Sequence, residues 1–289
     1  FTEASDAFYN GGGPGWMLPQ LRALVDGLTT TPDLVLLGVD QMWFNDHYAG
    51  DPAAFGYADE PTDFANVFLV NRSFTQTILD GEAIDLAAML ERREPGAGGL
   101  ALGFRAIRDG HGFRNDGSEQ YGDFLIAGWL WPPAERQRHL DWLRAGAEMY
   151  APNDTVSAEG LRDLAALLAA LADRGSHVIG FLTPLMPTIH DQLMADARHS
   201  YLHAVPGAVA PLFAEHGFPF HDFTDAAVVG GVDEDFFDGW HGSERMAAYV
   251  YLALLAAHPD LLGGYSDAER LRAQTDSAAD TFWVFSSPP

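Results

Sequence analysis

The hydrophobic positions of the chain alternate between two spacings. Between residues 18 and 28, leucine and valine recur at intervals of three and four, which predicts an amphipathic helix. A Thr-Thr-Thr-Pro segment ends this helix, and residues 33–39 then form an almost continuous apolar run. Such a run is typical of a strand in a parallel sheet that is covered on both faces. A helix followed by a buried strand indicates an α/β fold.

The same order returns in the second half of the chain. Ser157 is a suitable N-cap before leucines at helical spacing, and Gly175 ends the helix that they predict. Residues 177–183 are a second apolar run and predict a second buried strand. The further predicted elements are a helix over 188–216, a short strand over 218–223 and a strong helix over 242–257. The tail after residue 259 has no clear pattern.

Residues 46–150 interrupt this order and predict an insertion in a single domain of residues 1–289. Helical patterns occur at 63–79, 82–93 and 133–149, around a glycine-rich polar stretch at 108–118. A connection of this length between α/β units is typical of a cap or a substrate loop.

Composition narrows the function classes. The 289 residues include 41 acids and 16 bases, which gives a formal net charge of −25, and there is no cysteine. Disulfides, thiolate catalysis and cysteine zinc sites are therefore excluded, and nucleic acid is disfavoured because a negative field repels phosphates. No apolar run is long enough to span a bilayer. All the bases are arginine, which fits either a GC-rich genome or adaptation to brine.

The sharpest chemical motif is Asp238-Gly-Trp-His241, directly before the last predicted helix. An aspartate three residues before a histidine can fix the tautomer of the ring and stabilise its protonated form. His241 would then accept a proton from a hydroxyl nucleophile. The alternative hypothesis is that Asp238 only caps the helix.

This motif, after parallel strands and a glycine-rich first loop, resembles the SGNH (GDSL-like) hydrolase superfamily. The resemblance implies a three-layer α/β/α flavodoxin-like fold with Asp238 and His241 as two of three catalytic residues. The loop matches the family's Asn-x-Gly-x-x-Gly block at Asn10, Gly12 and Gly15. Gly15 is thereby implied as a backbone donor to the oxyanion. Without the resemblance, the loop is a glycine-rich turn with no ligand.

One block departs from the family pattern. The family has Gly-x-Asn at the end of the next strand, whereas this chain has Asp40 in the Asn position. An ionised carboxylate would repel an oxyanion, so Gln41 or Asn45 is the candidate replacement donor. The sequence from Leu37 to Asn45 resembles that of a divergent, envelope-associated branch of the superfamily. Members of this branch are related in general arrangement to alginate- and teichoic-acid-modifying proteins.

The family's nucleophile is a serine at the end of the first strand, for which this sequence has no matching motif. We expect that strand and serine, with any signal or membrane anchor, to lie upstream of Phe1. Ser5 and Ser118 are outside candidates.

The resemblance implies a serine-type ester hydrolase or O-acyl (acetyl) transferase of the cell envelope or another extracytoplasmic location. Its substrate would be an acylated carbohydrate or small ester, and no cofactor or metal is expected. The alternative is a catalytically inactive carbohydrate-binding or assembly protein on the same fold.

Three further groups of residues carry weaker signals. One is a set of histidines on the predicted 188–216 helix, in which a solvated face is favoured over a zinc pair: His190, His199 and His203. The second consists of arginines that either form a positive patch or pair with carboxylates: Arg105, Arg108 and Arg114. The third consists of tryptophans that either stack on a sugar or belong to the core: Trp129, Trp131 and Trp142.

Overall fold

The computed structural model describes residues 10–11, 17–48, 111–113, 119–121, 132–282 and 284–285. Two compact units divide the chain: residues 1–12, 52–130 and 285–289 form one, and residues 13–51 and 131–284 form the other. The described elements of the first unit are the antiparallel strands β2 (His111–Phe113) and β3 (Glu119–Tyr121). Residues 131–150, which the sequence places in the insertion, belong to the second unit.

The second unit contains a parallel sheet in the order β1-β4-β5, which confirms an α/β fold. Its strands are β1 (Leu34–Val39), β4 (His177–Leu182) and β5 (Phe220–Asp222). The central strand β4 pairs in parallel with both neighbours, and Leu182 lies opposite Val39 and Asp222. The segments that follow the carboxyl ends of the three strands therefore lie at the same edge of the sheet.

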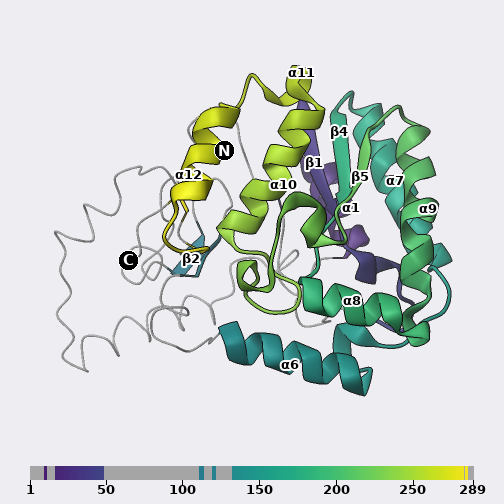
Figure 1. Cartoon of the computed structure of the whole chain (residues 1–289). Helices are drawn as coiled ribbons and strands as arrows, with labels where there is room; N and C mark the ends of the chain where they lie inside the picture. Colours follow the sequence, from purple (N-terminus) through teal and green to yellow (C-terminus); the bar gives the residue numbers. More distant parts are fainter. Residues whose placement is uncertain are drawn as a thin grey trace, which may run out of the picture. The chain divides into compact units, whose positions relative to one another are not determined.

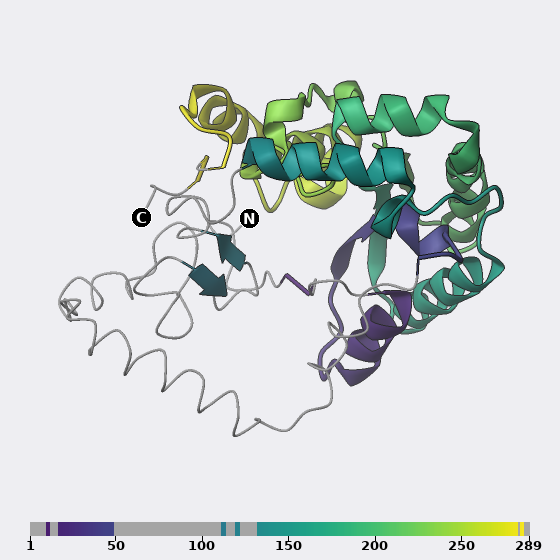
Figure 2. The same ribbon diagram turned by 90° about the horizontal axis from the view of Figure 1, so that it is seen from below.

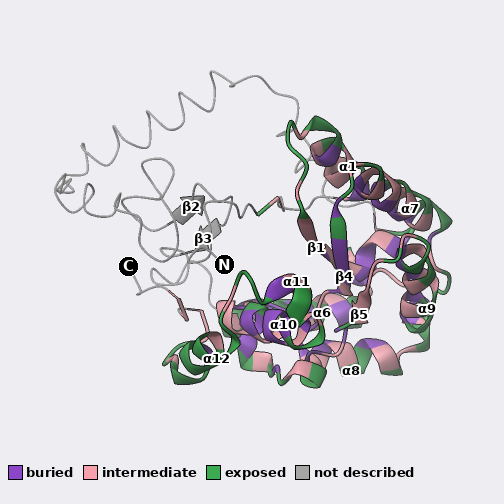
Figure 3. Ribbon diagram, turned by 90° about the horizontal axis from the view of Figure 1, so that it is seen from above, coloured by how far each residue is buried: buried purple, intermediate pink, exposed green. Residues whose placement is uncertain are grey.

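Helices cover both faces of this sheet (Figures 1 and 3). One face carries α1 (Leu18–Gly27), α7 (Ala158–Asp173) and α9 (Tyr201–Ala214). The other carries α10 (Glu244–Ala257) and the short α11 (Pro259–Leu262). Figure 2 shows α1, in purple, and the light green α10 on opposite sides of the sheet.

The remaining helices lie around this layered core. Helix α6 (Pro132–Ala145) packs against α8 (Pro187–Ala195), and α12 (Ala268–Ser277) packs against α10. The 3-10 turns are η1 (Gln41–Phe44), η3 (Glu148–Tyr150), η4 (Ala197–His199), η5 (Ala226–Val229) and η6 (Asp233–Asp235). None of the helices in the described ranges is long and apolar enough to cross a membrane.

The close approach of α9 to the sheet depends on Gly180 in β4. A Cβ atom at this position would lie 2.0 Å from Cε1 of Phe213, which is fully buried on α9. The absence of a side chain in the strand therefore lets the phenylalanine ring pack directly on the sheet.

One element prediction is wrong, and one segment for which the sequence predicts nothing contains helices. The helix predicted over 188–216 is interrupted because Asp196 adopts an extended backbone, and its carboxylate accepts a hydrogen bond from Arg198 N that begins η4. The tail after 259 contains α11 and α12, the latter capped by the Asp267 carboxylate through Arg270 N. The helices predicted at 63–79 and 82–93 lie outside the described residues.

Candidate functional site

The site is built on a tight loop, residues 236–242, which we call the site loop. Phe236 and Gly242 form an antiparallel bridge, and Phe237 N donates to His241 O at 2.8 Å. Directly after the loop, Ser243 caps α10 by accepting from Met246 N. The local backbone thus fixes where His241 leaves the loop.

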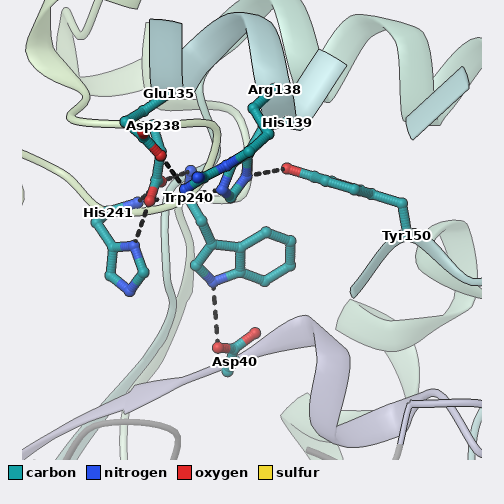
Figure 4. A network of polar contacts seen from close by, with 8 residues as sticks. All are labelled: Asp40, Glu135, Arg138, His139, Tyr150, Asp238, Trp240 and His241. Carbon is teal, nitrogen blue, oxygen red and sulfur yellow. Dashed lines mark hydrogen bonds and ion pairs between the residues drawn. The ribbon is translucent and has the colours of Figure 1, made fainter. Parts of the chain in front are cut away.

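Asp238 holds the ring of His241 with one oxygen and the backbone of the site loop with the other. Its Oδ2 lies 2.7 Å from His241 Nδ1, while Oδ1 accepts from Trp240 N at 2.7 Å and His241 N at 2.8 Å. The cap of α10 is Ser243, so a helix cap does not account for the contact between Asp238 and the ring. Only 8% of the Asp238 side chain is exposed, against 66% for His241, whose Nε2 edge points away from Asp238 (Figure 4).

The Asp238 carboxyl is held in its ionised form. Burial by itself would raise the pKa of Asp238, but the hydrogen bond with the His241 ring and the charges of His241 and His139 outweigh it. Together with the bond from His241 N, they lower the pKa to about 2. Asp238 is therefore a carboxylate at neutral pH and can stabilise a protonated His241.

A second histidine approaches Asp238 from the protein interior. His139 of α6 places Nε2 3.6 Å from Asp238 Oδ2, and its Nδ1 lies 2.9 Å from the hydroxyl of Tyr150 in η3. Burial lowers the pKa of the His139 ring, against the opposing effect of Asp238. Burial also raises the pKa of Tyr150, with the charges of Asp238 and Asp40 adding to it. Both groups are consequently neutral at pH 7.

The end of β1 supplies another carboxyl. Asp40 accepts from Met42 N at 3.0 Å through Oδ1 and from the Trp240 indole at 3.1 Å through Oδ2 (Figure 4). Burial raises its pKa to about 6, although these two hydrogen bonds and the charge of His241 oppose the rise. Asp40 thus lies within the electrostatic reach of His241, and it ties the site loop to the sheet through Trp240.

The two amides proposed as replacement donors are used inside the protein. Gln41 is buried and donates through Nε2 to Thr183 O and Thr224 Oγ1, at 2.6 and 3.1 Å, which joins the ends of the three strands. Asn45 is also buried, and its Nδ2 donates to Ala151 O at 2.7 Å. Neither amide is directed at His241 by these bonds.

Several predicted site residues cannot be compared with His241. Gly12 and Gly15 lie outside the described residues, and so do Ser5 and Ser118. Asn10 is described and exposed, but it belongs to the other compact unit.

The histidines of the interrupted 188–216 helix do not form a metal site. His199 is buried in η4, and His203 Nε2 on α9 contacts Met194 O at 3.1 Å. Across the described ranges, no cluster of three or more histidine or acidic side chains could hold a metal ion. A separate histidine pair, His221 Nε2 and His258 Nε2 at 2.7 Å, joins β5 to the end of α10.

The remaining aromatic and cationic candidates divide in the same way. Trp142 is partly buried, with its ring centroid 4.8 Å from that of His139 and Arg138 lying 5.0 Å above it. The other members of those two sets fall in undescribed parts of the chain: Arg105, Arg108, Arg114, Trp129 and Trp131.

Sequence reasoning did not find His139, Tyr150 or the indole of Trp240. The first two lie far from Asp238 along the chain, and α6 carries no motif that distinguishes a site histidine from a core one. Trp240 stands inside the motif, but its contact with Asp40 depends on tertiary structure.

No protein-family model, curated protein or solved structure matches the chain. The SGNH resemblance therefore rests on the quoted motifs.

Proposed function

We propose that the protein is a serine-type ester hydrolase or O-acyl transferase on an SGNH-type fold, acting on an acylated carbohydrate at the cell envelope. The observation that carries this proposal is the Asp238–His241 pair. A buried carboxylate holds Nδ1 of an exposed imidazole whose Nε2 edge faces away from it. This is the arrangement required of a general base that serves a hydroxyl nucleophile.

The first half of the proposed reaction, acylation of the serine, has two proton transfers. His241 Nε2 takes the proton of the serine hydroxyl as its oxygen attacks the ester carbonyl, and Asp238 stabilises the resulting imidazolium. His241 then gives that proton to the departing alkoxide, which leaves an acyl-serine. In the second half-reaction His241 takes a proton from the acceptor, whose oxygen attacks the acyl-serine, and returns that proton to the serine oxygen as the acyl–serine bond breaks. Water as the acceptor completes hydrolysis, and a sugar hydroxyl completes transfer.

The test is His241→Ala in the full-length protein, assayed with p-nitrophenyl acetate and with a fluorophosphonate probe that labels activated serines. We expect hydrolysis to fall at least about 100-fold and labelling to be lost, because a general base contributes 10²–10⁴. His177→Ala, an exposed histidine at the start of β4, is the matched control and should retain both. Wild-type hydrolysis by His241→Ala would show that the assignment is wrong.

The alternative is an inactive carbohydrate-binding protein, and one observation favours it. The resemblance puts Asp40 at the position of the family's Asn donor, and an ionised carboxylate at that position would oppose negative charge. This alternative predicts that the wild-type protein binds acetylated polysaccharide without turnover and without labelling by the probe.

A further inference from the structure

His139 and Tyr150 form a buried polar pair on the inner side of Asp238 (Figure 4). The His139 side chain is 4% exposed, and Tyr150 is 1% exposed. The two residues come from α6 and η3, so one continuous segment of the chain carries both of them to the site loop. Arg136 of the same helix fastens α6 to the loop by donating to Phe236 O at 2.7 Å.

Gly239 of the site loop is shaped to admit this pair. A Cβ at Gly239 would lie 2.5 Å from the Tyr150 hydroxyl oxygen and 3.0 Å from both Cβ and Nδ1 of His139. Any side chain at this position would displace the pair. The site loop therefore provides two things side by side: Gly239 leaves space for His139 and Tyr150, and Asp238 is the residue that His139 faces.

Electrostatics decides how the protons are arranged. The Tyr150 phenol is neutral and can donate to Nδ1 of the neutral His139 ring, which leaves the ring proton on Nε2, facing Asp238 Oδ2. The opposite tautomer would direct the Nε2 lone pair at a carboxylate, which is repulsive. Tyr150 therefore orients the His139 ring so that its Nε2–H faces Asp238 Oδ2, in an electrostatic contact at 3.6 Å that is too long for a hydrogen bond.

The other charged groups around His139 and Tyr150 do not take the place of the His139 Nε2–H beside Asp238. Arg138, the neighbour of His139 on α6, forms an ion pair with Glu135 and lies over the Trp142 ring. Asp40 reaches Tyr150 only through its charge. On the site-loop side, His241 and Asp238 are the charged groups that act on His139.

We propose that His139 and Tyr150 are positioning residues that fix the orientation of the Asp238 carboxylate and moderate the basicity of His241. His139 and His241 share the same oxygen, Oδ2, at 3.6 and 2.7 Å. The positive end of the His139 N–H partly offsets the negative charge on Oδ2. Oδ2 therefore stabilises the protonated form of His241 less than it would without His139. The catalytic part of this inference rests on the proposed function, whereas the coupling between the two rings does not.

The experiment measures the protonation of His241 directly. The titration of the His241 ring is followed by NMR in the full-length protein, with His241→Ala to assign its signal. In His139→Leu we expect the His241 pKa to rise by about half a unit or more, because Oδ2 loses the partial positive charge of the His139 N–H that faces it. His139→Gln, which keeps an N–H donor, should restore the wild-type value, and Tyr150→Phe should give a smaller rise.

The matched control is Leu143→Ala, a buried residue on α6 outside the polar network. It should lower stability and leave the titration of His241 unchanged. If His139→Leu does not fold, Tyr150→Phe, which removes one oxygen, carries the test. An unchanged or lowered His241 pKa in the folded variants would overturn the inference.

Hydrolysis of p-nitrophenyl acetate separates this inference from the proposed function. The ascending limb of kcat/KM against pH should move to higher pH by the same amount in His139→Leu and return in His139→Gln. A titration shift in a protein whose His241→Ala variant remains fully active would reject the catalytic assignment alone. Loss of activity in His241→Ala without any shift in His139→Leu would reject the positioning inference alone.

Discussion

Asp40 and Asp238 show how two carboxyl groups that contact the same tryptophan can differ in ionisation. Asp238 is buried and Asp40 half-buried, but Asp238 receives two backbone N–H donors and an imidazole, which reverse the effect of burial on its pKa. Asp40 has one backbone donor and the Trp240 indole, which do not compensate for burial. The donors and charges around each carboxyl decide whether its pKa ends below or above the ordinary value when burial raises it.

The raised pKa of Asp40 has a consequence for stability. Folding raises this pKa from 3.8 to about 6, so the folded protein retains a proton that the unfolded chain has lost. Asp40 therefore lowers the free energy of unfolding as pH rises from 4 to above 6, by up to about 3 kcal/mol. In Asp40→Asn this cost is absent. Urea unfolding should show the variant gaining stability relative to wild type over that interval.

The control for this prediction is Asp46→Asn, an exposed carboxyl on the same segment, which tests the removal of one negative charge. Equal pH profiles for wild type and Asp40→Asn would contradict the prediction.

For individual residues, the sequence predicted the contacts between positions that are close together in the chain. Asp238 and His241 are three positions apart, so their contact follows from the conformation of a single turn. His139 and Tyr150 reach Asp238 through the packing of α6, and no pattern within either segment encodes that contact. Gln41 and Asn45 were plausible donors by type, but each amide has a buried carbonyl as partner, which only the folded structure reveals.

At the scale of elements, the apolar runs predicted the strands and the leucine spacing predicted α1 and α7. The helix over 188–216 failed because apolar spacing continues through Asp196 and Ser200, where hydrogen bonding ends one helix and begins another. Periodicity records which side chains face the core, and it continues across a break that keeps the same face buried.

Alanine substitution at two glycines, one in β4 beneath α9 and one within α9, should change the free energy of unfolding in opposite directions. Gly180→Ala should lower the free energy of unfolding by about 1–3 kcal/mol or more, because its Cβ would overlap the Phe213 ring. Gly207→Ala, within α9 itself, meets no atom within 4 Å and should raise it by up to about 1 kcal/mol. Chemical denaturation of both variants measures the two values. A stabilised Gly180→Ala would show that α9 lies farther from β4 than described.

On the scale of the whole molecule, charge is the dominant property. The 41 acids outnumber the 16 bases by 25, so negative charge prevails over the chain as a whole. The negative charges within one folded chain repel one another, and this repulsion destabilises the compact state. This property was readable from composition alone, because it depends on counts and not on arrangement.

Salt should therefore stabilise the protein. We expect Tm to rise by a few degrees between 0.1 and 1 M NaCl, which corresponds to about 1–2 kcal/mol, as the Debye length shortens from about 10 to 3 Å. Sucrose at matched osmolality is the control for exclusion effects. A Tm that falls with salt would contradict the prediction. A further rise above 1 M, where screening is nearly complete, would favour adaptation to brine over a GC-rich genome as the origin of the acidity.

Trp240 contacts both site carboxyls, through its backbone N–H to Asp238 and its indole N–H to Asp40. The emission of an indole responds to the charge and hydrogen bonding beside it, so a change of protonation at either carboxyl reaches a chromophore. The site therefore contains its own optical reporter, and with the other six tryptophans replaced, Trp240 fluorescence would follow the protonation of the site without an added label.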